Sequence, residues 1–290
     1  MPIEHHDVFK QPPATATLWR YTNLAKFVSM ITTKALWFSN MYHLAKEDPF
    51  EGALPAGNFA YRTLTVETMP AALATRLKIG RFGDDAPIER KLRRYIEGED
   101  EMMKHFLRST KENFINCWHL AEYESAAMWK LYAEDSFGIA IISNLDRITA
   151  ALSGVKDGIM CGMVDYIDYE KDVLDMSNGF TPAVKKRLSF AHEREVRLLH
   201  WDTEIGEEQI ATLWNGQIRV MRQAMSHEDH AKIEPPPGKN FQCDLDKLVS
   251  EIRIAPTAPG WYEAAVRDFC KLAGFEKPIS RSQLLSSPIR

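Results

Sequence analysis

Residues 192–201, HEREVRLLHW, place charged side chains at positions 193, 195 and 197 and then continue into an apolar run. Alternate side chains of a β-strand share one face, so a strand here brings Glu193, Glu195 and Arg197 together. Two carboxylates about 7 Å apart beside a guanidinium form either a solvated ladder of ion pairs or the acidic end of a site that handles positive charge. The residues alone leave both interpretations open.

Short apolar runs that are typical of strands recur along the chain. They are LWRYT (18–22), ALWF (35–38), NFINCWHL (113–120), FGIAIIS (137–143), GMVDYIDY (162–169) and EIRIAP (251–256). Helical periodicity appears after the capping candidates Asn23, Ser125 and Asn144, and again over 261–274, where Gly274 predicts the end of the helix. Strands and helices interleave without a strict βαβ rhythm, which predicts a mixed α+β fold.

Helix formers dominate residues 66–110, which predicts a helical insertion in a single domain spanning 1–290. The segment EDPFEG (47–52) contains Pro and Gly, so we expect Asp48 and Glu51 to lie on a loop. Loops are where functional sites are commonly assembled. No internal repeat marks a second unit.

Composition places the chain among ordinary globular proteins, with 45% hydrophobic residues and a net charge of −4 that gives no general attraction to nucleic acid or membranes. The four cysteines lack a C-x-x-C pair, and no apolar run reaches membrane-span length, so we expect a cytoplasmic protein. The nucleotide-binding and serine-hydrolase fingerprints are missing. His227 and His230 lack a third ligand at a recognisable spacing, which favours surface histidines and predicts no metal site.

Two basic runs, RKLRR (90–94) and KKR (185–187), lie in helix-like amphipathic contexts, which favours solvated faces over phosphate-binding patches. The run MWKLY (128–132) favours a core helix face over a platform for stacking bases.

Arg20 interrupts the apolar strand 18–22, and a guanidinium in a half-buried strand needs an anionic partner. On the residues alone, a structural pair with Glu195 is favoured. The alternative is that Arg20 holds the phosphate or ribose of a ligand.

Four segments carry a resemblance to a known family: WRYTNLAKFVSMITTKALWFSN (19–40), EDPFEG (47–52), NCWHLAEYESAAMWKLYAEDSFGIAI (116–141) and FAHEREVR (190–197). In this order they resemble the bacterial family DUF2971, whose name implies no activity. Where that family often has Cys-Phe-Ser, this chain has Cys117, Trp118 and His119.

The layout is also similar, more distantly, to ADP-ribosyltransferases, in which an early strand supplies Arg or His to NAD and a late strand supplies the catalytic glutamate. This resemblance implies a mainly antiparallel sheet core and NAD as co-substrate. It implies that Glu195 is the catalytic acid with Glu193 as its partner. The remaining implied site residues are Arg20, Tyr21, Thr22, Trp118, Trp129 and Tyr132 for NAD, and Asp48, Glu51, Ser125 and Arg197 around the pocket.

Three functions therefore stay open. The first is an NAD-dependent ADP-ribosyltransferase-like enzyme, a toxin or defence effector by analogy, with an unknown protein, nucleic-acid or small-molecule acceptor. The second is a non-catalytic ligand- or protein-binding protein of the same fold. The third is a nucleic-acid-processing protein that uses its two basic runs.

Overall fold

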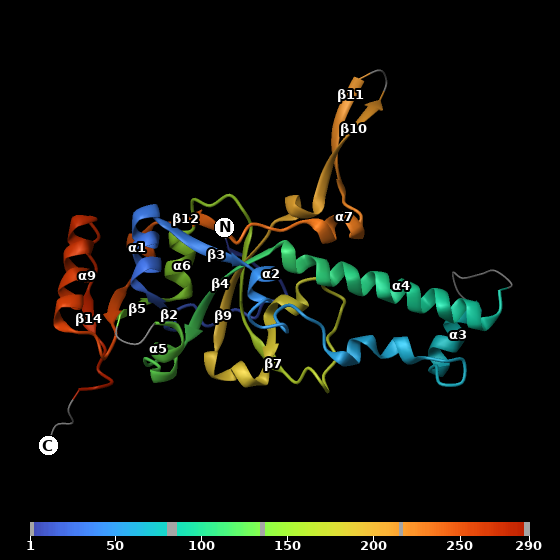
Figure 1. Cartoon of the computed structure of the whole chain (residues 1–290), viewed down its shortest axis with the longest axis horizontal. Coiled ribbons are helices and arrows are strands. Elements are labelled where there is room, and N and C mark those ends of the chain that lie inside the picture. The colour runs from blue at the N-terminus through green and yellow to red at the C-terminus, as the bar shows by residue number, and fades with distance from the viewer. Residues whose placement is uncertain (1–2, 80–85, 134–136, 215–216, 287–290) are drawn as a thin grey trace.

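A curled, mixed sheet of ten strands runs through the centre of the molecule (Figure 1). The computed structural model describes residues 3–79, 86–133, 137–214 and 217–286; residues 80–85 of the expected insertion lie outside that part. Its strands are β1 (Ile3–Glu4), β2 (Leu18–Asn23), β3 (Ala35–Asn40), β4 (Asn113–Leu120), β5 (Gly138–Ser143), β6 (Ile159–Met163), β9 (Glu195–Trp201), β12 (Gly238–Gln242), β13 (Glu251–Ile254) and β14 (Ile279–Arg281). The main path is β1-β6-β9-β4-β2-β5-β13-β14, while β3 joins β4 to β12. The pairs β1-β6 and β13-β14 are parallel and the others are antiparallel, so the core is α+β and mainly antiparallel, as expected.

Helices surround this sheet and extend from it. They are α1 (Leu24–Thr33), α2 (Met41–Leu44), α3 (Ala71–Ile79), α4 (Ile88–Arg108), α5 (Ala126–Tyr132), α6 (Leu145–Ala151), α7 (His227–Lys232), α8 (Leu245–Leu248) and α9 (Gly260–Leu272). The predicted caps are confirmed, since the side chains of Asn23, Ser125 and Asn144 accept hydrogen bonds from the first turns of α1, α5 and α6. Gly274 follows α9 with φ +66°, as the predicted helix end requires.

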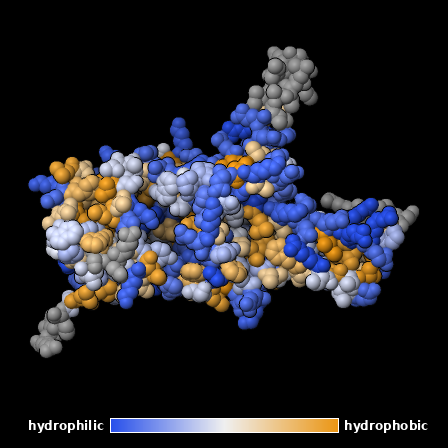
Figure 2. Space-filling model, in the orientation of Figure 1, coloured by the Kyte–Doolittle hydropathy of each residue, from blue (hydrophilic) through white to orange (hydrophobic). Residues whose placement is uncertain are grey.

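Two elements project from the body in Figure 1: the long helix α4, and a hairpin of β10 (Glu207–Trp214) and β11 (Gln217–Ala224). Hydrophilic residues are spread over the body and along α4, with hydrophobic residues between them (Figure 2). Among the described residues, no helix has the length and apolarity needed to cross a membrane.

Two expectations about local structure were wrong. Residues 162–169 do not form one strand: β6 ends at Met163, and β7 (Asp165–Ile167) turns away to pair with β8 (Lys185–Arg187) in a separate parallel sheet. The run 185–187 is therefore a strand, not part of a helix. Within it Lys186 is buried, so the expected solvated basic face does not exist at this residue.

The sheet is split along one edge of β4. Strand β2 pairs with residues 119–120 of β4, whereas β3 pairs with residues 114–115. In between, residues 116–118 of β4 pair with no described strand on that side, although β9 pairs with the opposite edge of β4 over residues 113–119. Helix α1 connects β2 to β3 and packs against both. The split leaves room for side chains between strands that would otherwise be adjacent.

Asn116 holds one side of this split. Its side chain is 1% exposed, donates to the Trp37 carbonyl at 2.8 Å, and accepts from Trp118 Nε1 at 2.7 Å. Buried polar groups need such partners, because an unsatisfied group keeps its full desolvation cost. Asn116 therefore replaces part of the missing strand pairing.

We expect Asn116→Ala to lower the free energy of unfolding by about 2–4 kcal/mol, since it leaves both Trp118 Nε1 and the Trp37 carbonyl without their partner. Urea unfolding followed by tryptophan fluorescence measures the change. Asn240→Ala, at an exposed strand position, is the control and should change stability by no more than about 0.5 kcal/mol. Equal unfolding midpoints for the two variants would contradict the bridging role of Asn116.

Candidate functional site

A cavity of about 280 Å³, called here the acidic cavity, opens beside the split. It is lined by residues of β2, β4, β8 and β9, of α2 and the loop after it, of helix α5 and of the segment after β8: Trp19, Arg20, Tyr21, Leu44, Glu47, Asp48, Glu51, Ile115, Cys117, Trp118, His119, Met128, Tyr132, Lys186, Phe190, Glu193, Glu195 and Arg197. Nine of the twelve site residues expected from sequence are in this set.

Strand register places the acid residue of β9 at this cavity. In the antiparallel pairing of β4 with β9, His119 lies opposite Glu195 and Cys117 lies opposite Arg197. Directly opposed residues share a face of the sheet, so all four side chains lie on one side. The expectation that Glu195 and Arg197 share a face is confirmed.

Glu193 reaches the same place by a different route from the one expected. It ends a 3₁₀ helix, Leu188–Glu193, and is followed by Arg194 in the left-handed region at φ 40°, so residues 192–197 are not one continuous strand. The Glu193 carbonyl lies 2.5 Å from His119 Nδ1, which must donate because a carbonyl only accepts. His119 therefore anchors the turn that presents Glu193.

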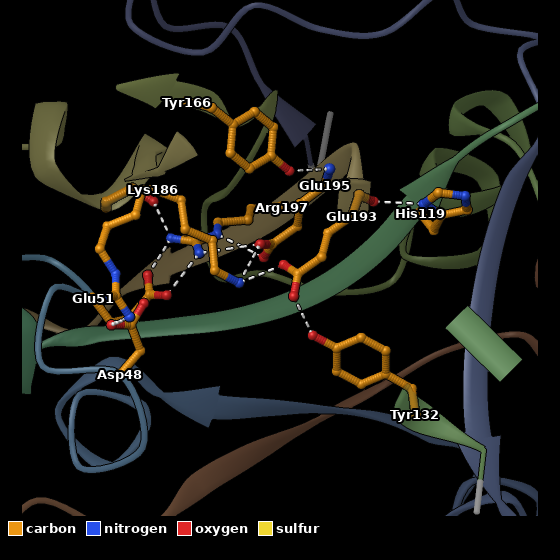
Figure 3. Close-up of polar contacts among 11 residues, drawn as sticks. Asp48, Glu51, His119, Tyr132, Tyr166, Lys186, Glu193, Glu195 and Arg197 are labelled. Carbon is orange, nitrogen blue, oxygen red and sulfur yellow. Dashed lines mark hydrogen bonds and ion pairs between the residues drawn. The ribbon is translucent and has the colours of Figure 1, made fainter. Parts of the chain in front are cut away.

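Lys186 joins the two glutamates (Figure 3). Its Nζ lies 2.5 Å from Glu193 Oε2 and 3.2 Å from Glu195 Oε2, and its side chain is 11% exposed. The hydroxyl of Tyr132 donates to the other oxygen of Glu193. The two carboxylates are thus fixed by one ammonium and one phenol.

Arg197 is the most deeply buried charge of the site, at 1% exposure. Its Nε donates to Glu195 Oε1 at 2.7 Å, and its Nη1 lies 2.5 Å from Glu51 Oε1 and donates to the Ala183 carbonyl at 2.7 Å. The loop residue Glu51 is thereby attached to β9. Asp48, on the same loop, pairs with Arg187 at 2.7 Å, so the expected loop positions of Asp48 and Glu51 are confirmed.

These contacts keep Glu195 ionised. Burial raises the pKa of its carboxyl, but Arg197 and Lys186 outweigh burial and lower it to about 2. Burial lowers the pKa of Lys186, but Glu195 and Glu193 raise it overall. The three carboxylates of Glu51, Glu193 and Glu195 face two cations, Lys186 and Arg197, which leaves one net negative charge.

Arg20 does not form the favoured structural pair with Glu195, because Lys186 and Arg197 already occupy both oxygens of that carboxylate. Instead its Nη1 donates to the Cys117 carbonyl at 3.3 Å, and its guanidinium lies 6.0 Å from the centre of the Trp118 ring. No carboxylate among the described residues pairs with it. Burial lowers the pKa of Arg20, and within the described part of the chain this half-buried cation has no anionic partner to offset the cost.

The aromatic residues expected at the site differ in how they meet the cavity. Tyr21 and Tyr132 line it, and Tyr132 is 45% exposed. Trp118 contributes to the wall but is 2% exposed. Trp129 does not line the cavity: it is 2% exposed, and its Nε1 donates to Glu124. Of these residues, Tyr132 has the most surface available to a ligand.

Two further expected residues lie outside the acidic cavity. Thr22 lines a neighbouring cavity. Ser125 caps α5, and its backbone N–H donates to the Tyr21 hydroxyl at 2.8 Å. It therefore holds Tyr21, which lines the acidic cavity, but does not line the cavity itself.

Sequence reasoning missed Lys186 and His119 as members of the site. Lys185, Lys186 and Arg187 are three consecutive basic residues, a run too short to distinguish helix from strand, and the pairing of β8 with β7 decides between them. The signal for His119 was that it departs from the Cys-Phe-Ser pattern of the family that the chain was expected to resemble. His230 is 3% exposed, so its assignment as a surface histidine was wrong. Within the part of the chain that the structure describes, no three His, Cys, Asp or Glu residues are grouped to hold a metal.

Comparisons of the chain with protein-family models, with curated proteins and with solved structures found no match. The resemblance to the DUF2971 family and the more distant similarity to ADP-ribosyltransferases stay predictions.

We expect Lys186→Met to lower the free energy of unfolding by about 3–5 kcal/mol, because it leaves two buried carboxylates without their shared ammonium. Lys185→Met is the matched control. Lys185 pairs with Asp165, which is 39% exposed, so its loss should cost about 1 kcal/mol or less. Urea unfolding at pH 7 compares the two, and a similar loss in both would show that Lys186 carries no special role.

The lowered pKa of Glu195 predicts a specific acid sensitivity. The ionised carboxylate stabilises the fold fully above its unfolded pKa of about 4.3, and this contribution is lost as pH falls towards 2, amounting to about 2–4 kcal/mol in all. Unfolding free energies of wild type and Glu195→Gln, measured between pH 6 and 2.5, should converge as pH falls. A constant difference over that range would contradict the ionised state of Glu195.

Proposed function

We propose that the chain is an NAD-dependent ADP-ribosyltransferase-like enzyme whose reaction takes place in the acidic cavity. The observation that carries the proposal is that one cavity contains both a buried cluster with net negative charge and Arg20, a cation that pairs with no carboxylate of the described residues. NAD carries a cationic nicotinamide ring at one end of a ribose and an anionic pyrophosphate at the other. A lining of both signs suits such a ligand.

The order of elements supports the same reading. Arg20 comes from the early strand β2, and Glu195 comes from the late strand β9, yet both line one cavity. The resemblance to ADP-ribosyltransferases requires an early basic residue and a late glutamate to meet in this way. An ADP-ribosyltransferase-like fold is part of the proposal.

Glu195 would act on the transition state of glycosidic cleavage. As the bond between ribose C1′ and the nicotinamide nitrogen breaks, the electron pair leaves with nicotinamide, which becomes neutral, and positive charge develops on the ribose. The Glu195 carboxylate, ionised at neutral pH, would stabilise that charge and bind a ribose hydroxyl. Its orientation is fixed in advance by Arg197 and Lys186.

Glu193 would act as the general base for the acceptor. An acceptor lone pair attacks C1′, and the proton released from the acceptor passes to a base, for which Glu193 is the adjacent carboxylate. The water-exposed part of Tyr132, which donates to Glu193, marks the side from which the acceptor would approach. Arg20 would bind the pyrophosphate.

A non-catalytic binding protein is the second candidate. It is favoured by the completeness of the ion-pair cluster, in which both oxygens of Glu195 already have partners within the chain.

The nucleic-acid-processing alternative loses one of its two basic runs, since Lys186 is buried against glutamates and Arg187 pairs with Asp48.

We expect the wild-type protein to release nicotinamide from NAD, and Glu195→Gln to reduce the rate by about 10²–10³-fold through loss of electrostatic stabilisation. The assay follows nicotinamide by chromatography, with and without cell lysate as a source of acceptors. Glu228→Gln, at an 85% exposed side chain, is the matched control and should keep the wild-type rate.

Folding of each variant is checked by circular dichroism, so that lost activity is not confused with lost structure. No release by folded wild-type protein under either condition would reject the enzyme and favour the binding-protein candidate.

A further inference from the structure

A second cavity, of about 220 Å³, lies between β2 and β3 under α1 and is called here the split cavity. Its lining is Arg20, Thr22, Lys26, Ser29, Met30, Ala35, Leu36, Trp37, Ile141 and Asn240. Arg20 is the residue that this lining shares with the acidic cavity. The two are separate cavities, and each falls below the range of about 300–1,000 Å³ typical of small-molecule sites, so each has room for part of a ligand such as a dinucleotide.

Trp37 supplies an aromatic surface to the split cavity. It lies on β3, is 42% exposed, and is opposite Asn240 of β12. Its ring is held against the backbone of Gly238, where an added Cβ would lie 2.3 Å from Cζ2 of the indole. A large aromatic side chain that is both exposed and held in place is a suitable surface for stacking a base.

The polar residues of the split cavity are suited to a phosphate and its attached sugar. Thr22 is 6% exposed, lines the cavity, and its hydroxyl has no hydrogen-bond partner among the described residues. Lys26, exposed in the first turn of α1, adds a second cation to Arg20. All the charges in this lining are positive, in contrast to the acidic cavity.

We infer that the split cavity binds a nucleoside 5′-phosphate, with the base on Trp37, the phosphate between Lys26 and Arg20, and the Thr22 hydroxyl on the sugar or phosphate. Because Arg20 also borders the acidic cavity, the nucleotide is the adenosine phosphate half of NAD, the half remote from the bond that breaks. In this respect the inference rests on the proposed function. Binding of the isolated nucleotide is a separate property that can be measured without any reaction.

The test is titration calorimetry of the full chain with AMP, with adenosine and inorganic phosphate as separate probes. Wild type should bind AMP more tightly than either probe. Trp37→Ala should weaken AMP binding about 5- to 100-fold by loss of base stacking, and Lys26→Ala should weaken AMP but not adenosine.

Trp261→Ala, which removes a 65% exposed tryptophan from α9, and Lys271→Ala, at an exposed lysine of the same helix, are the matched controls and should leave AMP binding unchanged. If Trp37→Ala proves unstable, Trp37→Leu removes the aromatic face but keeps an apolar side chain at this strand position, and it should also weaken AMP binding. Absence of AMP binding by wild type, or equal binding by Trp37→Ala and Trp261→Ala, would overturn the inference. Phosphate binding as tight as AMP would reduce the cavity to an anion site and overturn it too.

The two proposals fail separately. AMP binding that depends on Trp37, in a protein that releases no nicotinamide, would keep the nucleotide site and reject the enzyme. Nicotinamide release by a protein whose AMP binding does not depend on Trp37 would keep the enzyme and reject the nucleotide site.

Discussion

The buried guanidinium of Arg197 is the contact on which the rest of the site depends. From β9 it reaches Glu195 on its own strand, Glu51 on the loop after α2, and the carbonyl of Ala183 ahead of β8. Three segments far apart in sequence are thus attached to one planar group. Arginine suits this position better than lysine because its donors form a rigid fork that binds several acceptors at once.

Charge burial of this kind is costly, and it is weak support for the view that the cluster exists to stabilise the fold. Two cations and three carboxylates at 1% to 11% side-chain exposure lose most of their hydration, and their mutual attraction offsets the loss only while every partner is present. What the arrangement does achieve is a fixed, ionised Glu195 in a concave site. A preorganised carboxylate is useful where positive charge develops during a reaction, and less necessary where only packing is required.

Much of the fold could be predicted from local sequence because its signals are local. Asn23, Ser125 and Asn144 mark helix starts by a hydrogen bond within three residues, and residues 113–120 form a strand by their apolar content. The failures are those that distant contacts decide. Because Arg194 is left-handed, the strand begins at Glu195 and does not include Glu193. Lys186 is buried because β8 pairs with β7. Strand order, which periodicity does not encode, brings Arg20 and Glu195 to one cavity. It also brings Lys186 and Arg197 to the Glu195 carboxylate.

The split in the sheet affects how rigidly its two halves are joined. Strands β2, β5, β13 and β14 form one half of the sheet. Among the described residues, the register pairs that join this half to β4 are Leu18↔Leu120 and Trp19↔His119, and the Ala121 N–H donates to the Thr17 carbonyl beside them. Such a short seam resists bending less than a full strand pair would. A molecule that contacts both cavities and Arg20 would bind to both halves of the sheet. Its binding would therefore restrict the motion of one half relative to the other.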